Sequence, residues 1–399
     1  MSLSISERCR NIHPSVTLAI DSRAKQLRAM GLDVIGFGAG EPDFDTPKYI
    51  KDAARDALDA GLTKYTPVSG TNELKNEIQA KLLRDNGLEY ELTDIIVSTG
   101  AKQCLFNALS AILDPGNEVL IPSPAWVSYP EMVSMVGGVP ILVKGEASNN
   151  FTVSAEELQK YITPKTKALI LNSPNNPKGC VLSKVLLSDY AKLAVENQFY
   201  VISDEIYEKL IYDGGTHVSI ASLGEDIKAQ TIVINGVSKS YAMTGWRIGY
   251  AAGPKAVIKA MTSFQSHTTS NANSIAQHAA AVALTNGERF MHESLMEFTA
   301  RRNLMYDMLS AIDGLKCSLP SGAFYMMLDI SSLIGKSVNG KEIRGSDDFA
   351  GALLESKMVA VVPARAFGDD HYVRLSYATT REKIIVGIGR IAEFVKECV

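Results

Sequence analysis

YVISDEIYEKL at residues 200–210 and TIVINGVSKS at residues 231–240 are the two stretches that decide the fold. Each begins with a short run that is apolar on both faces of an extended chain and then becomes polar. Such runs are typical of strands that helices cover on both sides of a parallel sheet. Equivalent runs lie at residues 95–97, 119–121, 168–171 and 248–251. The sequence therefore predicts an α/β fold, with a large doubly wound domain built on a mainly parallel sheet.

The segments on either side of these strands predict a second, smaller domain. Thr46-Pro47 is expected to open a helix, since threonine caps helices and proline suits the first helical position. Residues 12–32 have the pattern of an arm followed by a helix. Helical patterns at 288–312 precede alternating, α+β-like segments near residues 322–329, 359–363 and 372–377. We predict a large domain over residues 48–285 and a small α+β domain formed by residues 1–47, with the N-terminal arm, and 286–399.

The composition argues against several classes of partner. The chain has 399 residues with 40 basic and 44 acidic side chains, a formal net charge of −4 and no basic block. Neither nucleic acid nor an anionic membrane is therefore an expected partner. No apolar run approaches the ~18 to 20 residues that span a bilayer, and residues 1–10 lack the apolar core of a signal peptide. We expect a soluble, cytoplasmic protein.

The cysteines and histidines favour neither disulfide bonds nor a metal centre. The five cysteines are an odd number with no paired spacing, and the six histidines never lie four residues apart. Cys104 lies among Leu105, Phe106 and Leu109, so it is predicted to be an inert thiol in the core.

Polar and aromatic side chains follow five of the six predicted strands. In an open α/β sheet, ligands bind beyond the carboxyl ends of the strands, so these residues should meet. In chain order they are the small-residue turn 98–102, then Trp126, then Asn176 within Asn172–Pro177, then Asp204 and Tyr207, and finally Ser238 and Lys239, with Arg247 eight residues further on.

The chemistry of this set suits a phosphorylated aldehyde cofactor. A lysine among small neighbours, Lys239, can bond covalently to an aldehyde. A carboxylate at the end of an apolar strand, Asp204, is costly to bury unless it meets a cation. Arg247 suits bidentate capture of a phosphate, and Trp126 offers a flat face for a ring. Each residue alone has an ordinary explanation, such as a surface lysine, a helix cap or a core tryptophan, but together they favour a site.

These residues and their surroundings resemble the class I aminotransferases, which are pyridoxal 5'-phosphate (PLP) enzymes of fold type I. The resemblance is strongest to the bacterial aspartate aminotransferases of subgroup Ib. It covers nearly the whole chain and is carried by GAGEPDF at 38–44, KYTP at 64–67, NNP at 175–177, SDEIY at 203–207, Ser238-Lys239 with Arg247, PSGAFY at 320–325 and RLS at 374–376.

The resemblance implies a role for each site residue. Lys239 would carry PLP and move the substrate proton, while Asp204 would pair with the cofactor's protonated pyridine nitrogen. Tyr207 and Asn176 would bond to its phenolic oxygen. The residues assigned to the cofactor are Ser238, Gly100, Ala101, Lys102, Trp126 and Arg247, and Tyr65 would reach the phosphate from the partner subunit of a homodimer. Gly40 and Arg374 would bind the substrate α-carboxylate, with Trp126 and Asn176 beside it, and Thr17 would help to bind a distal carboxylate. Lys102 is the candidate cation for that distal carboxylate because it lies one residue beyond the phosphate-holding turn.

We therefore predict transamination between L-aspartate and 2-oxoglutarate, giving oxaloacetate and L-glutamate. Aminotransfer from aromatic, branched or alanine donors, and a PLP-dependent lyase, use the same catalytic set and stay open as alternatives. A non-enzymatic regulator would need a fused DNA-binding segment, which we do not expect. A dinucleotide site at the glycine-rich residues 36–40 is disfavoured because residues 41–45 do not open a helix.

Two positions depart from the family pattern. Lys178 stands where threonine is common, and Arg365 is larger than usual for its loop, so it could alter substrate access. Relatives that also accept prephenate carry a lysine where this chain has His13. A largely neutral imidazole binds a second large carboxylate substrate poorly, so we expect little prephenate activity.

Overall fold

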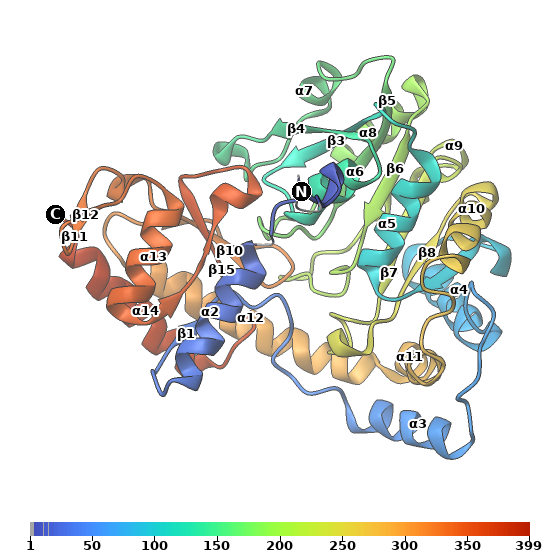
Figure 1. Cartoon of the computed structure of the whole chain (residues 1–399), viewed down its shortest axis with the longest axis horizontal. Coiled ribbons are helices and arrows are strands. Elements are labelled where there is room, and N and C mark those ends of the chain that lie inside the picture. Colours follow the sequence, from blue (N-terminus) through green and yellow to red (C-terminus); the bar gives the residue numbers. More distant parts are fainter. Residues whose placement is uncertain (1–3, 11, 15) are drawn as a thin grey trace.

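The computed structural model describes residues 4–10, 12–14 and 16–399 (Figure 1). Its larger part is built on a seven-stranded sheet in the order β2-β8-β7-β6-β5-β3-β4. Six strands run parallel, and β8 runs antiparallel to both of its neighbours. The strands are β2 (Ile95–Ser98), β3 (Glu118–Ser123), β4 (Val139–Lys144), β5 (Thr166–Asn172), β6 (Tyr200–Asp204), β7 (Thr231–Gly236) and β8 (Gly249–Ala252). The mainly parallel sheet predicted from the sequence is confirmed.

Two features of this sheet were not predicted. The strand β4 lies at the sheet edge with Val139 43% and Leu142 47% exposed, so it lacks a run of apolar residues on both faces. The reversal of β8 follows from its connection to β7, because residues 237–248 hold a single 3-10 turn and no crossover helix. A return to a parallel strand usually requires such a helix.

Helices cover both faces of the sheet, as a doubly wound fold requires (Figure 1). Ile96, Ile170 and Ile234 point toward one set of helices, and their neighbours in the strands point toward the other. Cys104 is fully buried in the first layer, as predicted. The first layer holds α5 (Ala101–Ile112), α6 (Ser128–Met135) and α10 (Lys255–Ser266), and the second holds α4 (Asn72–Asn86), α8 (Lys184–Asn197) and α11 (Ser274–Asn286).

The smaller part is built on a four-stranded antiparallel sheet in the order β14-β15-β10-β9. Figure 1 shows α12 running from this part to the larger one. The N-terminal segment joins it because β1 pairs with β13. Its strands and helices are β1 (Ile35–Gly36), β9 (Lys316–Cys317), β10 (Tyr325–Asp329), β13 (Val359–Ala360), β14 (Val362–Pro363), β15 (Tyr372–Ser376), α2 (Val16–Ala29), α12 (Glu288–Ser310), α13 (Ser346–Lys357) and α14 (Arg381–Glu397).

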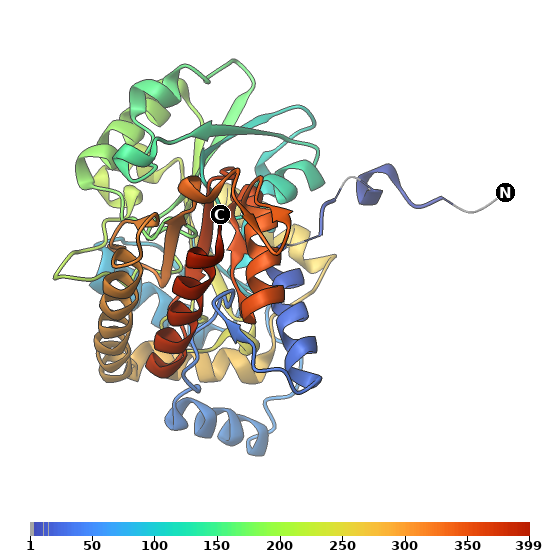
Figure 2. The ribbon, with the colours of Figure 1, turned by 90° about the vertical axis from the view of Figure 1, so that its left-hand side faces the viewer.

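These contacts support the division that we propose, with residues 48–285 in the large domain and residues 1–47 and 286–399 in the small one. Residues 1–3, 11 and 15 of the proposed small domain lie outside the described residues. Figure 2 shows the segment that carries α1 (Glu7–Arg10) extending away from the rest of the molecule. Among the residues that the structure describes, no helix has the length and apolar character needed to cross a membrane.

The sequence predicted that Thr46 caps the helix α3 (Lys48–Asp59), and this prediction is wrong. Pro47 occupies the N-cap position, and no side chain caps the helix. The Thr46 hydroxyl instead donates to the Ala242 carbonyl at 2.6 Å and accepts from the Trp246 indole at 3.0 Å. A tertiary contact therefore takes the place of the local one.

A buried ion pair joins α4 to the segment that follows β6. The side chains of Lys81 and Glu208 are 2% and 5% exposed and contact each other directly. Asn86 accepts from Lys81 at 2.7 Å and donates to Glu208 at 3.0 Å, so both charged groups have further partners. Satisfied in this way, the two charges can remain ionised away from water.

The pair continues into a network around Glu205. This carboxylate accepts from Ser203 and Ser219 at 2.8 and 2.6 Å, and lies 2.9 Å from His217 Nε2. Burial opposes a charge on His217, but the adjacent carboxylates outweigh it and raise the pKa of the imidazole. Glu205, Glu208 and His217 bring potential metal ligands together. Because each carboxylate already has hydrogen-bonding or charged partners, the group is explained as a structural network.

Replacing one partner of the buried pair tests this explanation. Lys81→Met should lower the free energy of unfolding by about 3–5 kcal/mol, because it leaves the buried Glu208 carboxylate without its direct ion-pair partner. Urea denaturation followed by circular dichroism measures the loss. The double variant Lys81→Met with Glu208→Leu should regain most of it, since no buried charge is left unpaired. A loss below about 1 kcal/mol in the single variant would contradict a desolvated pair.

Candidate active site

A cavity of about 450 Å³ lies at the carboxyl edge of the large sheet, where the small part faces it. It brings together every predicted site residue except Gly100 and Tyr65. The predicted residues that line it are Thr17, Gly40, Ala101, Lys102, Trp126, Asn176, Asp204, Tyr207, Ser238, Lys239, Arg247 and Arg374. Tyr65 lies apart from this set with 91% of its surface exposed.

Lys239 follows β7 and is positioned by the N-terminal segment. Its ammonium group donates to the Gly40 carbonyl at 2.6 Å. Burial lowers the pKa of Lys239 to about 8, with the positive charge of Arg247 adding to the shift and Glu41 and Asp204 opposing it. At neutral pH a fraction of this lysine is therefore an uncharged nucleophile, which an ordinary surface lysine is not.

Asp204 ends β6 and is 4% exposed. Burial raises the pKa of its carboxyl group to about 6, although hydrogen bonds from Tyr129 and the Ile206 amide lower it. The Tyr129 hydroxyl donates to Oδ2 at 2.6 Å, and the Ile206 amide lies 3.3 Å from Oδ1. The positive charge of Lys239 also lowers this pKa, but its effect on the carboxyl group is smaller than that of burial or of the two hydrogen bonds.

Two further residues of the site, Tyr129 and Tyr325, were not predicted from the sequence. Tyr129 lies three residues after Trp126, and the two rings meet edge to face with centroids 5.3 Å apart. Tyr325 begins β10, and its hydroxyl lies 2.9 Å from that of Tyr207. The spacing from Trp126 was the available signal for Tyr129. Tyr325 was visible only as the last residue of the motif at 320–325.

Arg374 lies in the middle of β15 and is 1% exposed. Its Nη1 donates to Asn176 Oδ1 and its Nη2 to the Gly38 carbonyl, both at 2.9 Å. The guanidinium carbon lies 4.4 Å from the centroid of the Tyr325 ring. Its Nε is buried, and no described residue accepts a hydrogen bond from it. A buried donor of a charged group that lacks an acceptor favours binding of an anion.

A cradle suited to a small anion forms where the turn after β2 meets the start of β8. Gly100 has φ +85°, and a Cβ there would lie 2.3 Å from Arg247 Nη2. A Cβ on Gly249 would lie 2.1 Å from the Ala101 nitrogen. At both positions a side chain would collide with a neighbouring group, so only glycine allows these segments to approach so closely. The cradle combines the exposed guanidinium of Arg247 with the free amides at the start of α5.

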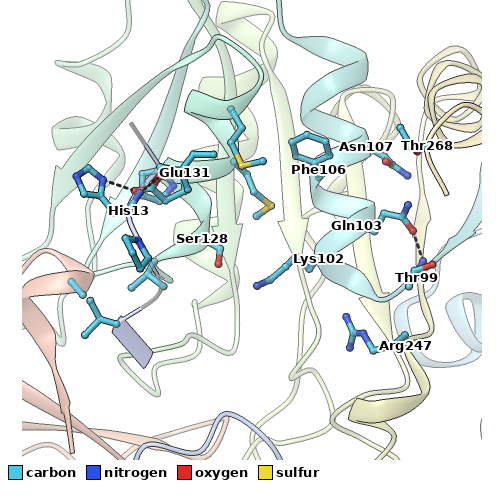
Figure 3. Close-up of a pocket in the computed structure, with 18 of the residues that line it drawn as sticks. His13, Thr99, Lys102, Gln103, Phe106, Asn107, Ser128, Glu131, Arg247 and Thr268 are labelled. Atoms are coloured by element: carbon cyan, nitrogen blue, oxygen red, sulfur yellow. Dashed lines mark hydrogen bonds and ion pairs between the residues drawn. The ribbon is translucent and has the colours of Figure 1, made fainter. Parts of the chain in front are cut away.

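A second cavity, of about 850 Å³, adjoins the first between α5, α6 and the N-terminal arm (Figure 3). Lys102 and Arg247 line both cavities. The Lys102 ammonium lies 4.8 Å from the centroid of the Trp126 ring, and burial, with Arg247 nearby, lowers its pKa. At the far side His13 Nδ1 lies 3.1 Å from Glu131, which ties the arm to α6.

The two departures from the family pattern lie away from the first cavity. Lys178 donates to the Phe151 carbonyl at 3.2 Å. Asn176 keeps its position because its backbone amide donates a hydrogen bond to Asn172 Oδ1 at 2.8 Å. Arg365 lines the second cavity and pairs with Asp347 at 3.2 Å.

A doubly wound sheet with a lysine, a carboxylate and an anion cradle at its carboxyl edge defines the fold-type I class of PLP-dependent transferases. Comparison with known proteins narrows the class. The family model for aminotransferase class I and II matches residues 32–391. The chain belongs to this family and is an aminotransferase.

Relatives with assigned names are similar over their whole length. An aspartate aminotransferase of Bacillus sp. (strain YM-2) is 49% identical, over 98% of this chain and 99% of its own. The crystal structure of an aspartate aminotransferase from Rhizobium meliloti matches all of both chains with a TM-score of 0.96 at 44% identity. The Thermus thermophilus aspartate aminotransferase with maleate matches 98% of this chain and 100% of its own, with a TM-score of 0.93 at 45% identity.

The lowered pKa of Lys239 leads to a testable prediction. Cofactor-free protein that is mixed with PLP and reduced with borohydride should carry the label on Lys239, as peptide mapping would show. The initial rate of capture should rise with pH through a midpoint near 8, because only the neutral amine attacks the aldehyde. A label on another lysine, or a midpoint near the ~10.4 of an unperturbed lysine, would contradict the assignment.

Proposed function

We propose that this chain binds PLP and transfers the amino group of L-aspartate to 2-oxoglutarate, giving oxaloacetate and L-glutamate. The observation that carries the proposal is one cavity that holds Lys239, Asp204, Arg247 and Arg374 together. The similarity to aspartate aminotransferases supports the choice of amino donor.

The residues present fit PLP. Gly100 lets the Arg247 guanidinium approach the turn after β2, because a Cβ there would lie 2.3 Å from Nη2, and the donors of this cradle suit a phosphate. Lys239 is partly neutral and lies in the same cavity, as a covalent link to an aldehyde requires. Asp204 is buried with a raised pKa, so a pyridinium nitrogen would provide the cation that it lacks. Trp126 offers a ring face at the same cavity.

The chemistry that PLP supplies when bound is an electron-withdrawing ring, which accepts the electron pair released as the substrate Cα–H bond breaks. Asp204 keeps the positive charge at the pyridine end, because an anion there favours the protonated nitrogen. Lys239 Nζ takes the proton from the substrate Cα and, in the reverse half-reaction, returns a proton to the Cα of the new amino acid. Tyr207, whose hydroxyl bonds to Tyr325, is positioned to donate toward the phenolic oxygen.

Arg374 and Gly40 are proposed to hold the α-carboxylate. The guanidinium is fixed by Asn176 and Gly38, and its buried Nε has no acceptor among the described residues. A Cβ on Gly40 would lie 3.5 Å from the Tyr325 hydroxyl, at ordinary van der Waals contact. Asn176 thus connects cofactor and substrate through one amide.

Lys102 and Thr17 are proposed to bind the distal carboxylate. Lys102 places its ammonium beside Trp126 at the rim of the cavity. Thr17 also lines the cavity, and its hydroxyl is buried with no hydrogen-bond partner among the residues that the structure describes. The Thermus relative was solved with maleate, which carries two carboxylates, and this supports a dicarboxylic substrate. With His13 engaged by Glu131, we expect little prephenate turnover.

A homodimer with shared active sites is proposed from the position of Tyr65. This side chain is 91% exposed and lies outside the cavity of its own chain. The exposed guanidinium of Arg247 faces the second cavity, through which a residue of another copy could reach the phosphate. Tyr65 of a neighbouring subunit fits this position.

A donor panel with the variant Lys102→Met tests the substrate assignment. With 2-oxoglutarate as acceptor, the wild type should prefer aspartate to alanine, aromatic and branched donors. Lys102→Met should raise KM for aspartate about 10- to 100-fold, in line with roughly 1.5–3 kcal/mol for a charge-assisted hydrogen bond, while sparing alanine. Steady-state kinetics at saturating PLP measures both.

Two outcomes would contradict the dicarboxylate assignment. One is an equal loss with aspartate and alanine, which would mean that Lys102 acts on the cofactor alone. The other is a wild-type preference for aromatic or branched donors. Release of ammonia or carbon dioxide in place of glutamate would identify a lyase. Lys184→Met, which removes an exposed lysine that lines neither cavity, is the matched control and should change neither KM.

Complementation between inactive subunits tests the shared site. Lys239→Ala and Tyr65→Ala proteins, mixed under conditions of subunit exchange and limiting PLP, should regain activity, because each mixed dimer rebuilds one intact site. Native mass spectrometry verifies the exchange. If mixed dimers form and no activity returns, Tyr65 does not act across the subunits.

A further inference from the structure

Gln265, near the end of α10, is completely buried and uses all of its amide hydrogen-bonding capacity. Its Oε1 accepts from Ser98 Oγ at 2.6 Å and from Asn107 Nδ2 at 2.8 Å. Its Nε2 donates to the carbonyls of Val68 and Val97, both at 2.9 Å. A glutamine has two donors and two acceptor positions, so none is left over. Because every donor and acceptor of the Gln265 amide is engaged, this side chain holds the four groups that it bonds to in fixed positions.

The acceptor side of Gln265 holds the start of the anion cradle. Ser98 is the last residue of β2, and the next residues form the turn into α5. In this turn the Thr99 amide donates to Gln103 Oε1 at 2.5 Å (Figure 3). Gln103 in turn donates to Thr269, just beyond α10, at 2.5 Å. Both ends of the turn are therefore tied to the C-terminal end of α10.

The donor side of Gln265 holds the loop that carries Tyr65. This loop lies along the open edge of β2, where the Val97 amide donates to the Ser69 carbonyl at 2.9 Å. The approach is close, since a Cβ on Gly70 would lie 2.6 Å from Val97 Cγ2. By bonding to the carbonyls of Val68 and Val97 together, Gln265 joins the loop to the strand.

We propose that Gln265 is a positioning residue that couples the phosphate cradle of its own subunit to the loop that offers Tyr65 to the neighbouring subunit. The inference rests on the proposed function, in which PLP is the ligand and Tyr65 acts across the dimer. One buried amide then influences phosphate binding in two active sites. It acts on the site of its own subunit through the turn after Ser98, and on the site of the neighbouring subunit through the loop at Val68.

A purely structural glutamine would have a different signature. Loss of general packing weakens binding of any ligand in the cavity to a similar extent. Loss of cradle geometry weakens binding of the phosphate alone. Pyridoxal and PLP differ only in the phosphate, so the ratio of their dissociation constants separates the two roles.

The first test is Gln265→Met, which keeps the side-chain length and removes the amide. The dissociation constants of PLP and pyridoxal are measured on cofactor-free protein by absorbance. We expect the preference for PLP over pyridoxal to fall about tenfold or more, because the Ser98 hydroxyl and two backbone carbonyls lose their partner. A parallel loss for both ligands, or no change for either, overturns the proposal. A wild type that binds neither ligand overturns the proposed function instead.

Gln230→Met is the matched control. The Gln230 amide also donates to two backbone carbonyls, those of Ala194 and Phe199, at 3.4 and 3.2 Å. It precedes β7 and therefore lies at the opposite edge of the sheet from the cavity. The preference for PLP should remain that of the wild type in this variant.

Ser98→Ala keeps the proposal testable if Gln265→Met does not fold. It removes one hydroxyl and leaves the amide in place, so the preference for PLP should fall about threefold. An unchanged preference in folded Ser98→Ala protein counts against the cradle half of the proposal.

A mixed dimer tests the coupling. One subunit carries Lys239→Ala together with Gln265→Met, and the other is wild type, so the single intact lysine belongs to the wild-type subunit. The phosphate preference measured at that lysine should still fall, because Tyr65 comes from the altered subunit. A preference equal to that of a mixed dimer with Lys239→Ala alone would show that Gln265 acts only on its own site.

Discussion

The buried guanidinium of Arg374 joins three stretches of chain on which the cavity depends. From β15 it donates to Asn176, in the loop after β5, and to the Gly38 carbonyl, in the N-terminal segment. A guanidinium that is 1% exposed is costly unless its donors find acceptors. The small sheet, the large sheet and the N-terminal segment must therefore meet at this point, and the cavity is the space that remains between them.

Burial also explains the reactivity of that space. The same removal from water lowers the pKa of Lys239 to about 8 and raises that of Asp204 to about 6. Both pKa values therefore lie near neutral pH, where a small change in the surroundings decides whether each group is charged. Tyr129 limits the shift of Asp204 by donating to it. A bound ligand of complementary charge can therefore shift either group fully to its charged form.

The parts of the fold that could be predicted were those with a local cause. A run buried on both faces identifies a strand, and the polar residue after it identifies the binding edge, which is how Asp204 and Lys239 were found. The strand β4 escaped because its edge position leaves it half exposed. Gln265 was not predicted because its contacts depend on how α10 packs, and no spacing in the sequence reports that packing. The substrate role of Thr17 came from the resemblance, whereas that of Lys102 was inferred from its place one residue beyond the phosphate-holding turn.

The reversed strand β8 has a consequence for the size of molecule that the cavity accepts. Lys239 follows β7 and Arg247 precedes β8, and the two strands pair through Gly236 and Gly249. Lys239 lies three residues after Gly236 and Arg247 two residues before Gly249, so this strand pair fixes both ends of the connection that carries the two side chains. A longer or shorter connection would change the spacing of the lysine and the arginine, and with it the size of the molecule that can contact both.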